Sequence, residues 1–109
     1  MGPRLSFAVA FIFILGACGE NSKTPVGGNG DPSRGRQVYL AQCTACHNSD
    51  PAKDGPLGPA IKGSSRELLE ARLLRGAYPS GYTPKRNTSV MKPMPPLEAS
   101  IPDLAAFLR

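Results

Sequence analysis

The sequence predicts a small all-α domain, and three observations support this. Segments 31–43, 64–76 and 100–109 carry the start, spacing or stop signals of helices. The stretches between them are loop-like, in a 109-residue chain with twelve prolines and twelve glycines. No segment reads convincingly as a strand. We therefore expect a single domain, residues 31–109, with three main helices joined by long loops.

The first helix is predicted to begin at Asp31, whose side chain can cap free amides, followed by Pro32 at the first helical position. Gly35 and Tyr39 are four residues apart and share one face. Glycine lowers helix propensity, so Gly35 indicates that another element approaches closely there.

The second helix has the clearest signals in the chain. Ser64 with Glu67 fits a capping box, Arg75 lies in the last turn and Gly76 fits a C-terminal stop. Helical spacing places four side chains on one face of this helix: Leu68, Leu69, Arg72 and Leu73. The three leucines are expected to pack in the core.

The closing helix is expected to be capped by Ser100, with an apolar face formed by Ile101, Leu104, Ala105 and Leu108. Residues 48–65 and 77–99 are predicted to be long loops. So few helices could not enclose a dry core around such loops unless something apolar fills the middle.

The N-terminal residues 1–17 are typical of a secretory signal. Arg4 supplies the positive start, and residues 7–15 form an apolar run that is too short for a membrane span of roughly 20 residues. The ending Leu15–Cys18 resembles the lipobox of bacterial lipoproteins. This resemblance implies cleavage before Cys18 and lipidation of its thiol. The alternative is a secreted protein whose Cys18 leaves with the signal.

A lipidated Cys18 implies an exported protein on the periplasmic face of a bacterial membrane. Gly19 favours the outer membrane by the sorting rule that the lipobox resemblance implies. Residues 18–30 are polar and glycine-rich, and they predict a flexible tether between the anchor and the domain.

The formal net charge is +5, and without Arg4 the mature chain carries about +4. It has no lysine- or arginine-rich run and no basic patch interleaved with aromatic residues, which argues against nucleic-acid binding. A mild positive excess favours docking to an acidic protein partner or an anionic surface.

The chemistry is concentrated in residues 43–47, "CTACH". Cys43, Cys46 and His47 include two of the three cysteines and the only histidine. Two cysteines at i and i+3 followed by histidine form the pattern of c-type haem attachment. Two thioether bonds fix the edge of one haem, and His47 then supplies a nitrogen ligand to the iron. An export signal agrees with this chemistry, which is completed outside the cytoplasm.

The motif has rival interpretations, among them a structural zinc site and a redox-active dithiol. A structural zinc site normally needs four ligands, and only three cysteine or histidine residues remain once Cys18 is assigned to the anchor. A thioredoxin-like dithiol normally follows a strand in a βαβ pattern, whereas a helix precedes this motif. The pattern therefore favours haem.

Residues 31–109 resemble the single-haem class I cytochrome c family. The stretch 35–47, "GRQVYLAQCTACH", is similar to its first helix and haem motif, and 58–63, "GPAIKG", to its Gly-Pro-x-Leu-x-Gly. The resemblance implies that the Pro59 carbonyl orients His47, with Pro56 as a rival. It also implies that Phe107, in "DLAAFL", crosses the first helix near Gly35.

The family's second axial ligand is a methionine, and the second predicted loop, residues 77–99, offers Met91 and Met94. Met-Pro-Pro at residues 94–96 is similar to a frequent family pattern and favours Met94. The family's spacing to the closing aromatic favours Met91, which is sixteen residues before Phe107, whereas Met94 is thirteen before it. We prefer Met91. The other methionine is expected to be an apolar gap-filler.

The same loop contains four residues that are candidates for binding the haem propionates or are simply solvated: Tyr78, Tyr82, Lys85 and Arg86. Lys85, Arg86 and Lys92 are also candidates for a basic docking surface, which would steer association more than tighten it.

The expected function is one-electron transfer between redox partner proteins, with no small-molecule substrate and no enzymatic step. The second hypothesis is a haem protein with an open sixth position that acts as a sensor or a catalytic haem. It is disfavoured because the chain has no other histidine. The third is a lipoprotein with a redox-active dithiol and no haem.

Overall fold

The computed structural model describes residue 2 and residues 30–109. The signal segment 1–17, Cys18 and nearly all of the tether 18–30 lie outside the described residues. The described part contains helices α1 (Pro32–Gln42), α2 (Arg66–Arg75) and α3 (Ile101–Leu108), the last preceded by the 3-10 helix η1 (Pro95–Ser100). Residues 30–109 contain no strand. The predicted all-α class is therefore confirmed.

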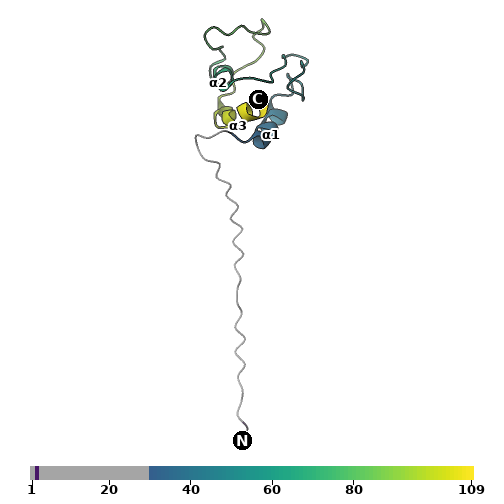
Figure 1. The fold of residues 1–109 in the computed structure, drawn as a ribbon, viewed down its shortest axis with the longest axis vertical. Helices are drawn as coiled ribbons and strands as arrows, with labels where there is room; N and C mark the ends of the chain where they lie inside the picture. Colours follow the sequence, from purple (N-terminus) through teal and green to yellow (C-terminus); the bar gives the residue numbers. More distant parts are fainter. Residues whose placement is uncertain (1, 3–29) are drawn as a thin grey trace.

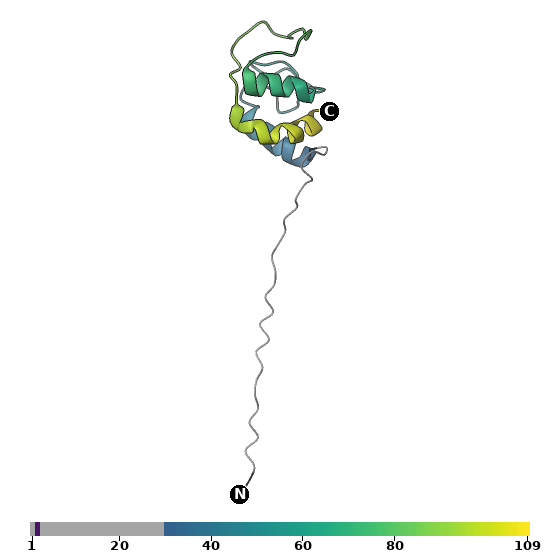
Figure 2. The ribbon, with the colours of Figure 1, turned by 90° about the vertical axis from the view of Figure 1, so that its left-hand side faces the viewer.

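Helix α3 lies between the other two helices (Figures 1 and 2). It crosses α1 on one side and contacts α2 on the other. Gly30, where the described domain begins, lies against Pro102 and Asp103 at the start of α3. The loop between α2 and η1 lies on the other side of the domain, beyond α2. None of the helices in the described part combines the length and apolarity that a bilayer span requires.

The start of α1 agrees with the prediction. The Asp31 carboxylate accepts hydrogen bonds from the backbone N–H groups of Ser33 (2.8 Å) and Arg34 (3.3 Å), and Pro32 occupies the first turn. A Cβ at Gly35 would strike the backbone carbonyl of Asp103 and lie 2.9 Å from the Cβ of Phe107. Gly35 thus allows α1 and α3 to cross closely, as both the propensity argument and the family resemblance imply.

The capping box predicted at Ser64 and Glu67 is wrong. The N-cap of α2 is Ser65, whose hydroxyl accepts from the N–H of Leu68 at 3.1 Å. The Ser64 hydroxyl instead donates to the carbonyl of Ile61 at 2.6 Å. Two adjacent serines compete for the cap, and the preceding turn engages the first. The stop is confirmed, since Gly76 has a φ of 62°, in the left-handed region that favours glycine.

The second loop ends earlier than predicted. Residues 95–100 form η1, which runs directly into α3, because Pro95 and Pro96 have the fixed φ of a first helical turn. Ser100 is at the N-cap position of α3, but its side chain makes no capping hydrogen bond. The preceding turn satisfies amides that a cap would otherwise bind.

The core is a single cluster contributed by all three α-helices. Its buried members are Tyr39, Leu69, Leu73, Ile101, Leu104 and Leu108. Leu68, predicted to pack with them, is only half-buried. Tyr39 and Phe107 make a tilted aromatic contact with ring centroids 5.4 Å apart across the α1–α3 crossing.

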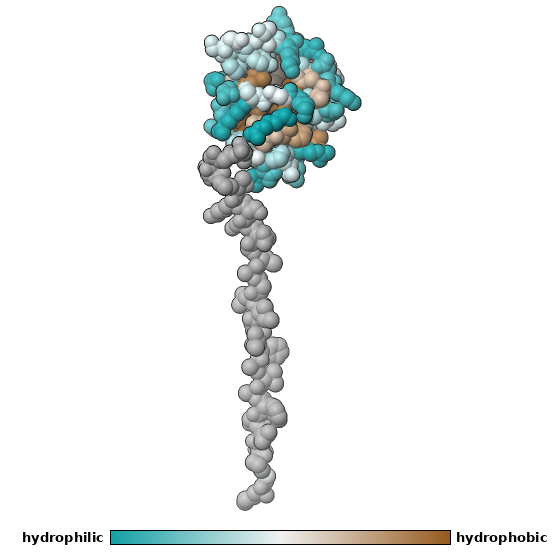
Figure 3. Space-filling model, in the orientation of Figure 1, coloured by the Kyte–Doolittle hydropathy of each residue, from teal (hydrophilic) through white to brown (hydrophobic). Residues whose placement is uncertain are grey.

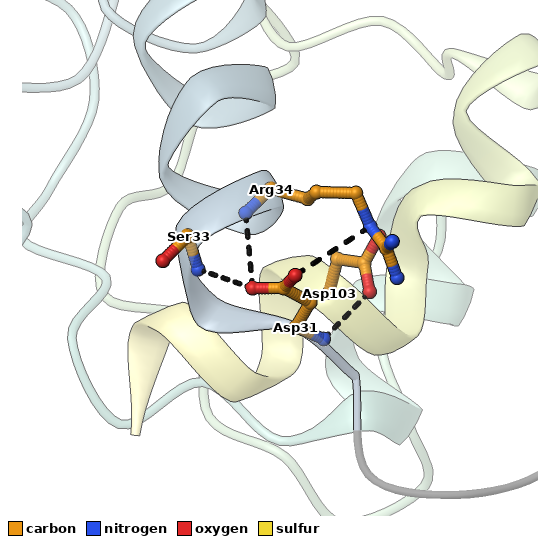
Figure 4. Close-up of polar contacts among 4 residues, drawn as sticks. All are labelled: Asp31, Ser33, Arg34 and Asp103. Atoms are coloured by element: carbon orange, nitrogen blue, oxygen red, sulfur yellow. Dashed lines mark hydrogen bonds and ion pairs between the residues drawn. The ribbon is translucent and has the colours of Figure 1, made fainter. Parts of the chain in front are cut away.

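Polar contacts join the starts of α1 and α3 (Figure 4). The Asp103 carboxylate accepts from the backbone N–H of Asp31 at 2.7 Å and pairs with the Arg34 guanidinium at 3.2 Å. Burial opposes the charged form, but these two contacts outweigh it and lower the pKa of Asp103. The network fixes the ends of two helices that are far apart in sequence.

Candidate functional site

The C-terminal end of α1 places the "CTACH" motif. Cys43 is the C-cap of α1, and the N–H groups of Cys46 (3.3 Å) and His47 (2.9 Å) both donate to its carbonyl. The motif is therefore a turn that continues from the helix. The Tyr39 hydroxyl donates to the carbonyl of Asn48, which holds the chain just after the histidine against α1.

A glycine turn closes over the motif from the next loop. The N–H groups of Leu57 (3.2 Å) and Gly58 (2.9 Å) donate to the carbonyl of Cys46. A Cβ at Gly58 would lie 2.7 Å from the Nδ1 of His47, and one at Gly55 would strike the backbone of residues 46–48. Both glycines are needed for this close approach.

His47 is the one buried polar or charged side chain among the described residues, with 8% exposed. Its Nδ1 lies 2.8 Å from the carbonyl oxygen of Pro59, so Nδ1 carries the proton and donates. The structure thus contains the contact that the family resemblance implies, at Pro59 and not at Pro56. The tautomer leaves Nε2 as the basic nitrogen that can bind a metal.

Two adjoining cavities, of about 110 and 230 Å³, open beside the histidine. Both are lined by Cys46, His47, Leu69, Leu73 and Met91, and the larger one also by Cys43. Figure 3 shows apolar surface exposed in the middle of one face, bordered by hydrophilic side chains. An apolar interior that opens to solvent is typical of a site for a flat, largely apolar group.

The two candidate methionines are both partly buried and pack against the core. Met91 lines both cavities, whereas Met94 lines only the larger one. The backbone N–H of Met94 donates to the carbonyl of Leu73 at 2.7 Å, which ties this end of the loop to α2.

Comparison with known proteins agrees with this geometry. Residues 32–109 match the protein family described as "Cytochrome c". The chain belongs to the cytochrome c family. Family membership gives the protein a covalently attached haem c.

One curated relative is a "Cytochrome c-553-like" protein of Synechocystis sp. (strain ATCC 27184 / PCC 6803 / Kazusa). The two are 32% identical over 79 residues, which cover 72% of this chain and 65% of that protein. The chain therefore spans just under two thirds of the relative's length. No solved structure matches the chain significantly.

The residues of this cytochrome c domain fit the haem c of its family. Two thiols line the larger cavity, and a buried imidazole with its Nδ1 already bound lies beside both cavities. The predominantly apolar walls suit a porphyrin, and Met91 supplies a thioether sulfur to the same space.

The rival sites for the motif find little support. Burial, followed by the neighbouring Cys46, raises the pKa of the Cys43 thiol to about 11, which disfavours a reactive thiolate. Within residues 30–109, no group of three or more His, Cys, Asp or Glu side chains could hold a metal ion, so the zinc alternative lacks a ligand set there.

The aromatic residues of the loop gather beside the smaller cavity. Tyr78 and Tyr82 stack with ring centroids 5.5 Å apart, and the Arg72 guanidinium lies 4.3 Å from the centre of the Tyr78 ring. Arg72 also donates to the carbonyl of Gly76 at 3.1 Å. The helical spacing placed Arg72 beside the leucines but gave no sign of these two contacts.

The basic residues of the loop have partners that the sequence did not reveal. Lys85 donates to the carbonyl of Ala60 at 2.8 Å, and Arg86 pairs with Asp54 at 3.3 Å. Lys92 is exposed and lines the larger cavity. Asp54 was missed because a single acidic residue in a polar loop carries no signal of its own.

Proposed function

We propose that this cytochrome c domain carries single electrons between redox partner proteins and performs no enzymatic step. In this proposal Cys43 and Cys46 would form the thioether bonds, and His47 would bind the iron through Nε2. The observation that supports it best is the His47 ring, which lines both cavities while its Nδ1 is held by Pro59 at 2.8 Å. The haem supplies the uptake and release of one electron.

We propose Met91 as the sixth ligand. It lines both cavities together with His47, and Met94 lines only one of them. Its position sixteen residues before Phe107 agrees with this choice. A methionine thioether bound to the iron would favour a raised reduction potential and would leave no coordination position for a small ligand.

The loop side chains divide into two groups in this proposal. Tyr78 and Tyr82 line the smaller cavity as a stacked pair, so they are the candidates for hydrogen bonds to the haem carboxylates. Lys85 and Arg86 already hold other groups of the chain. Lys92 remains a candidate contact for an acidic redox partner.

We further propose that the protein is exported and anchored by lipidated Cys18 on the periplasmic face of a bacterial membrane, with residues 18–30 as its tether. The lipobox-like ending of residues 15–18 supports this. Gly30 lies against the start of α3, on the other side of the domain from the loop that carries Met91, so the tether would join the domain away from that loop. Mass spectrometry of the mature N-terminal peptide should show acylated Cys18, and an unmodified cysteine would end the anchor proposal.

Absorption spectra of the exported, haem-loaded protein test the electron-carrier proposal. We expect a low-spin spectrum with a methionine–Fe(III) charge-transfer band and no response to carbon monoxide. Met91→Ala should abolish the band, and Met94→Ala, the matched control in the same loop, should retain it. Loss of the band in Met94→Ala alone would reverse the assignment. Ready carbon monoxide binding by the wild type would favour a sensor or catalytic haem.

A further inference from the structure

The peptide group between Pro59 and Ala60 is held at both of its polar atoms. Its carbonyl oxygen, from Pro59, lies 2.8 Å from the Nδ1 of His47. Its N–H, from Ala60, donates to the Oδ1 of Asp54 at 2.8 Å. A peptide group is planar, so a contact that fixes the N–H also fixes the direction of the carbonyl. The Asp54 carboxylate therefore controls the orientation of the histidine's hydrogen-bond acceptor.

The same peptide couples the Asp54 carboxylate and the His47 imidazole electrostatically. A hydrogen bond from the N–H to a carboxylate polarises the peptide and makes its carbonyl a stronger acceptor. The Ala60 N–H contact and then Arg86 lower the pKa of Asp54, with burial opposing them, so the carboxylate is charged at neutral pH. A stronger acceptor at Nδ1 raises the basicity of the imidazole as a metal ligand.

The methionine loop, residues 77–94, reaches the same point from the other side. Arg86 pairs with the Oδ2 of Asp54 at 3.3 Å, and Lys85 donates to the carbonyl of Ala60 at 2.8 Å. Both atoms of Ala60 that can hydrogen-bond are thus engaged, one by Asp54 and one by Lys85. The loop that carries Met91 is thereby tied to the loop that orients His47.

We propose that Asp54 is a positioning residue, which orients His47 through the Pro59–Ala60 peptide and, with Lys85 and Arg86, fixes the methionine loop to that peptide. This inference rests on the proposed function, in which His47 and Met91 would bind the haem iron. It assigns Lys85 and Arg86 to the joining of two loops.

The first test compares Asp54→Ala with Asp50→Asn in the haem-loaded protein. Asp50 is the control because it lies in the same loop and likewise accepts a backbone N–H, but its carboxylate binds the N–H of Ala52 at 2.9 Å and pairs with Lys53 at 4.0 Å. Asp54→Ala should speed solvent exchange of the Ala60 amide about tenfold and shift the reduction potential upward, because the imidazole becomes less basic. Asp50→Asn should leave both close to wild type. Equal changes in the two variants would overturn the proposal.

The second test addresses the methionine loop. The double variant Lys85→Gln, Arg86→Gln should bind added imidazole at the ferric iron more tightly, because a loop that is no longer fixed gives up Met91 more easily. The expected gain in affinity is about three- to fivefold, since exposed charge pairs contribute little individually. Asp54→Asn should raise this affinity too, and combining it with the double variant should add less than the separate effects. Unchanged affinity would overturn the coupling of the two loops. A wild type without the methionine band would instead refute the proposed ligation, while Ala60 exchange would still test the role of Asp54.

Discussion

At the scale of single residues, this domain depends on positions where no side chain fits. Gly35 allows the crossing of α1 and α3, and Gly58 lies against the ring of His47. The sequence indicated Gly35, because glycine inside a helix lowers its propensity and needs a reason. It indicated Gly58 only through the family resemblance, since glycines in a loop are common.

Gly35→Ala should destabilise the domain. The added Cβ would strike the backbone carbonyl of Asp103, which cannot move aside as a flexible side chain could. Overpacking of this kind costs about 1–3 kcal/mol, more than the gain in helix propensity. Urea unfolding of the haem-loaded protein measures the loss. The control is Gln37→Ala on the exposed face of α1, which should stay within about 0.5 kcal/mol of wild type. A Gly35→Ala variant as stable as this control would contradict the close crossing.

At the scale of the elements, helix existence was predictable but helix starts were less so. The three predicted α-helices all form, and both Asp31 and Gly76 act as predicted. The errors are one residue at α2, where Ser65 is the cap, the missed helix η1, and Ser100, whose side chain does not cap α3. At these points the local sequence is compatible with more than one helix start, and contacts with other segments decide where the helix begins.

Ser65→Ala should lower the free energy of unfolding by about 1 kcal/mol, because the N–H of Leu68 loses its acceptor. Ser65→Asp should restore the loss, since aspartate is a good N-cap and its charge suits the helix dipole. Thermal unfolding of the two variants beside wild type makes the comparison. Equal losses in Ser65→Ala and Ser65→Asp would argue that the position does not act as a cap.

At the scale of the whole molecule, the first and last helices are joined by polar contacts as well as by the core. Asp103 on α3 binds the start of α1 through Asp31 and Arg34. Its folded pKa is lowered from the ordinary value of 3.8. The stability it contributes is therefore present above that value and is lost as the pH falls through the lower folded pKa.

Asp103→Asn should destabilise the protein at pH 7 by about 1 kcal/mol, since the ion pair is lost while one hydrogen bond can remain. The difference from wild type should shrink as the pH falls below the ordinary pKa of 3.8. Urea unfolding of both proteins at a series of pH values measures it. A difference that stays constant down to the lowest pH would show that the charge of Asp103 is not responsible.

The sequence by itself determined the parts whose chemistry is local. The "CTACH" spacing, the cap at Asp31 and the helical leucine pattern are properties of neighbouring residues, and they were enough to predict the helical class and the attachment of haem. The tertiary structure decided what depends on contacts between distant segments. It placed Pro59 and not Pro56 at the Nδ1 of His47, it placed Met91 beside both cavities, and it brought Asp54 to Ala60 and Arg86. These pairings join loops, in which no periodic pattern fixes the direction of a side chain, so they arise only when the chain folds.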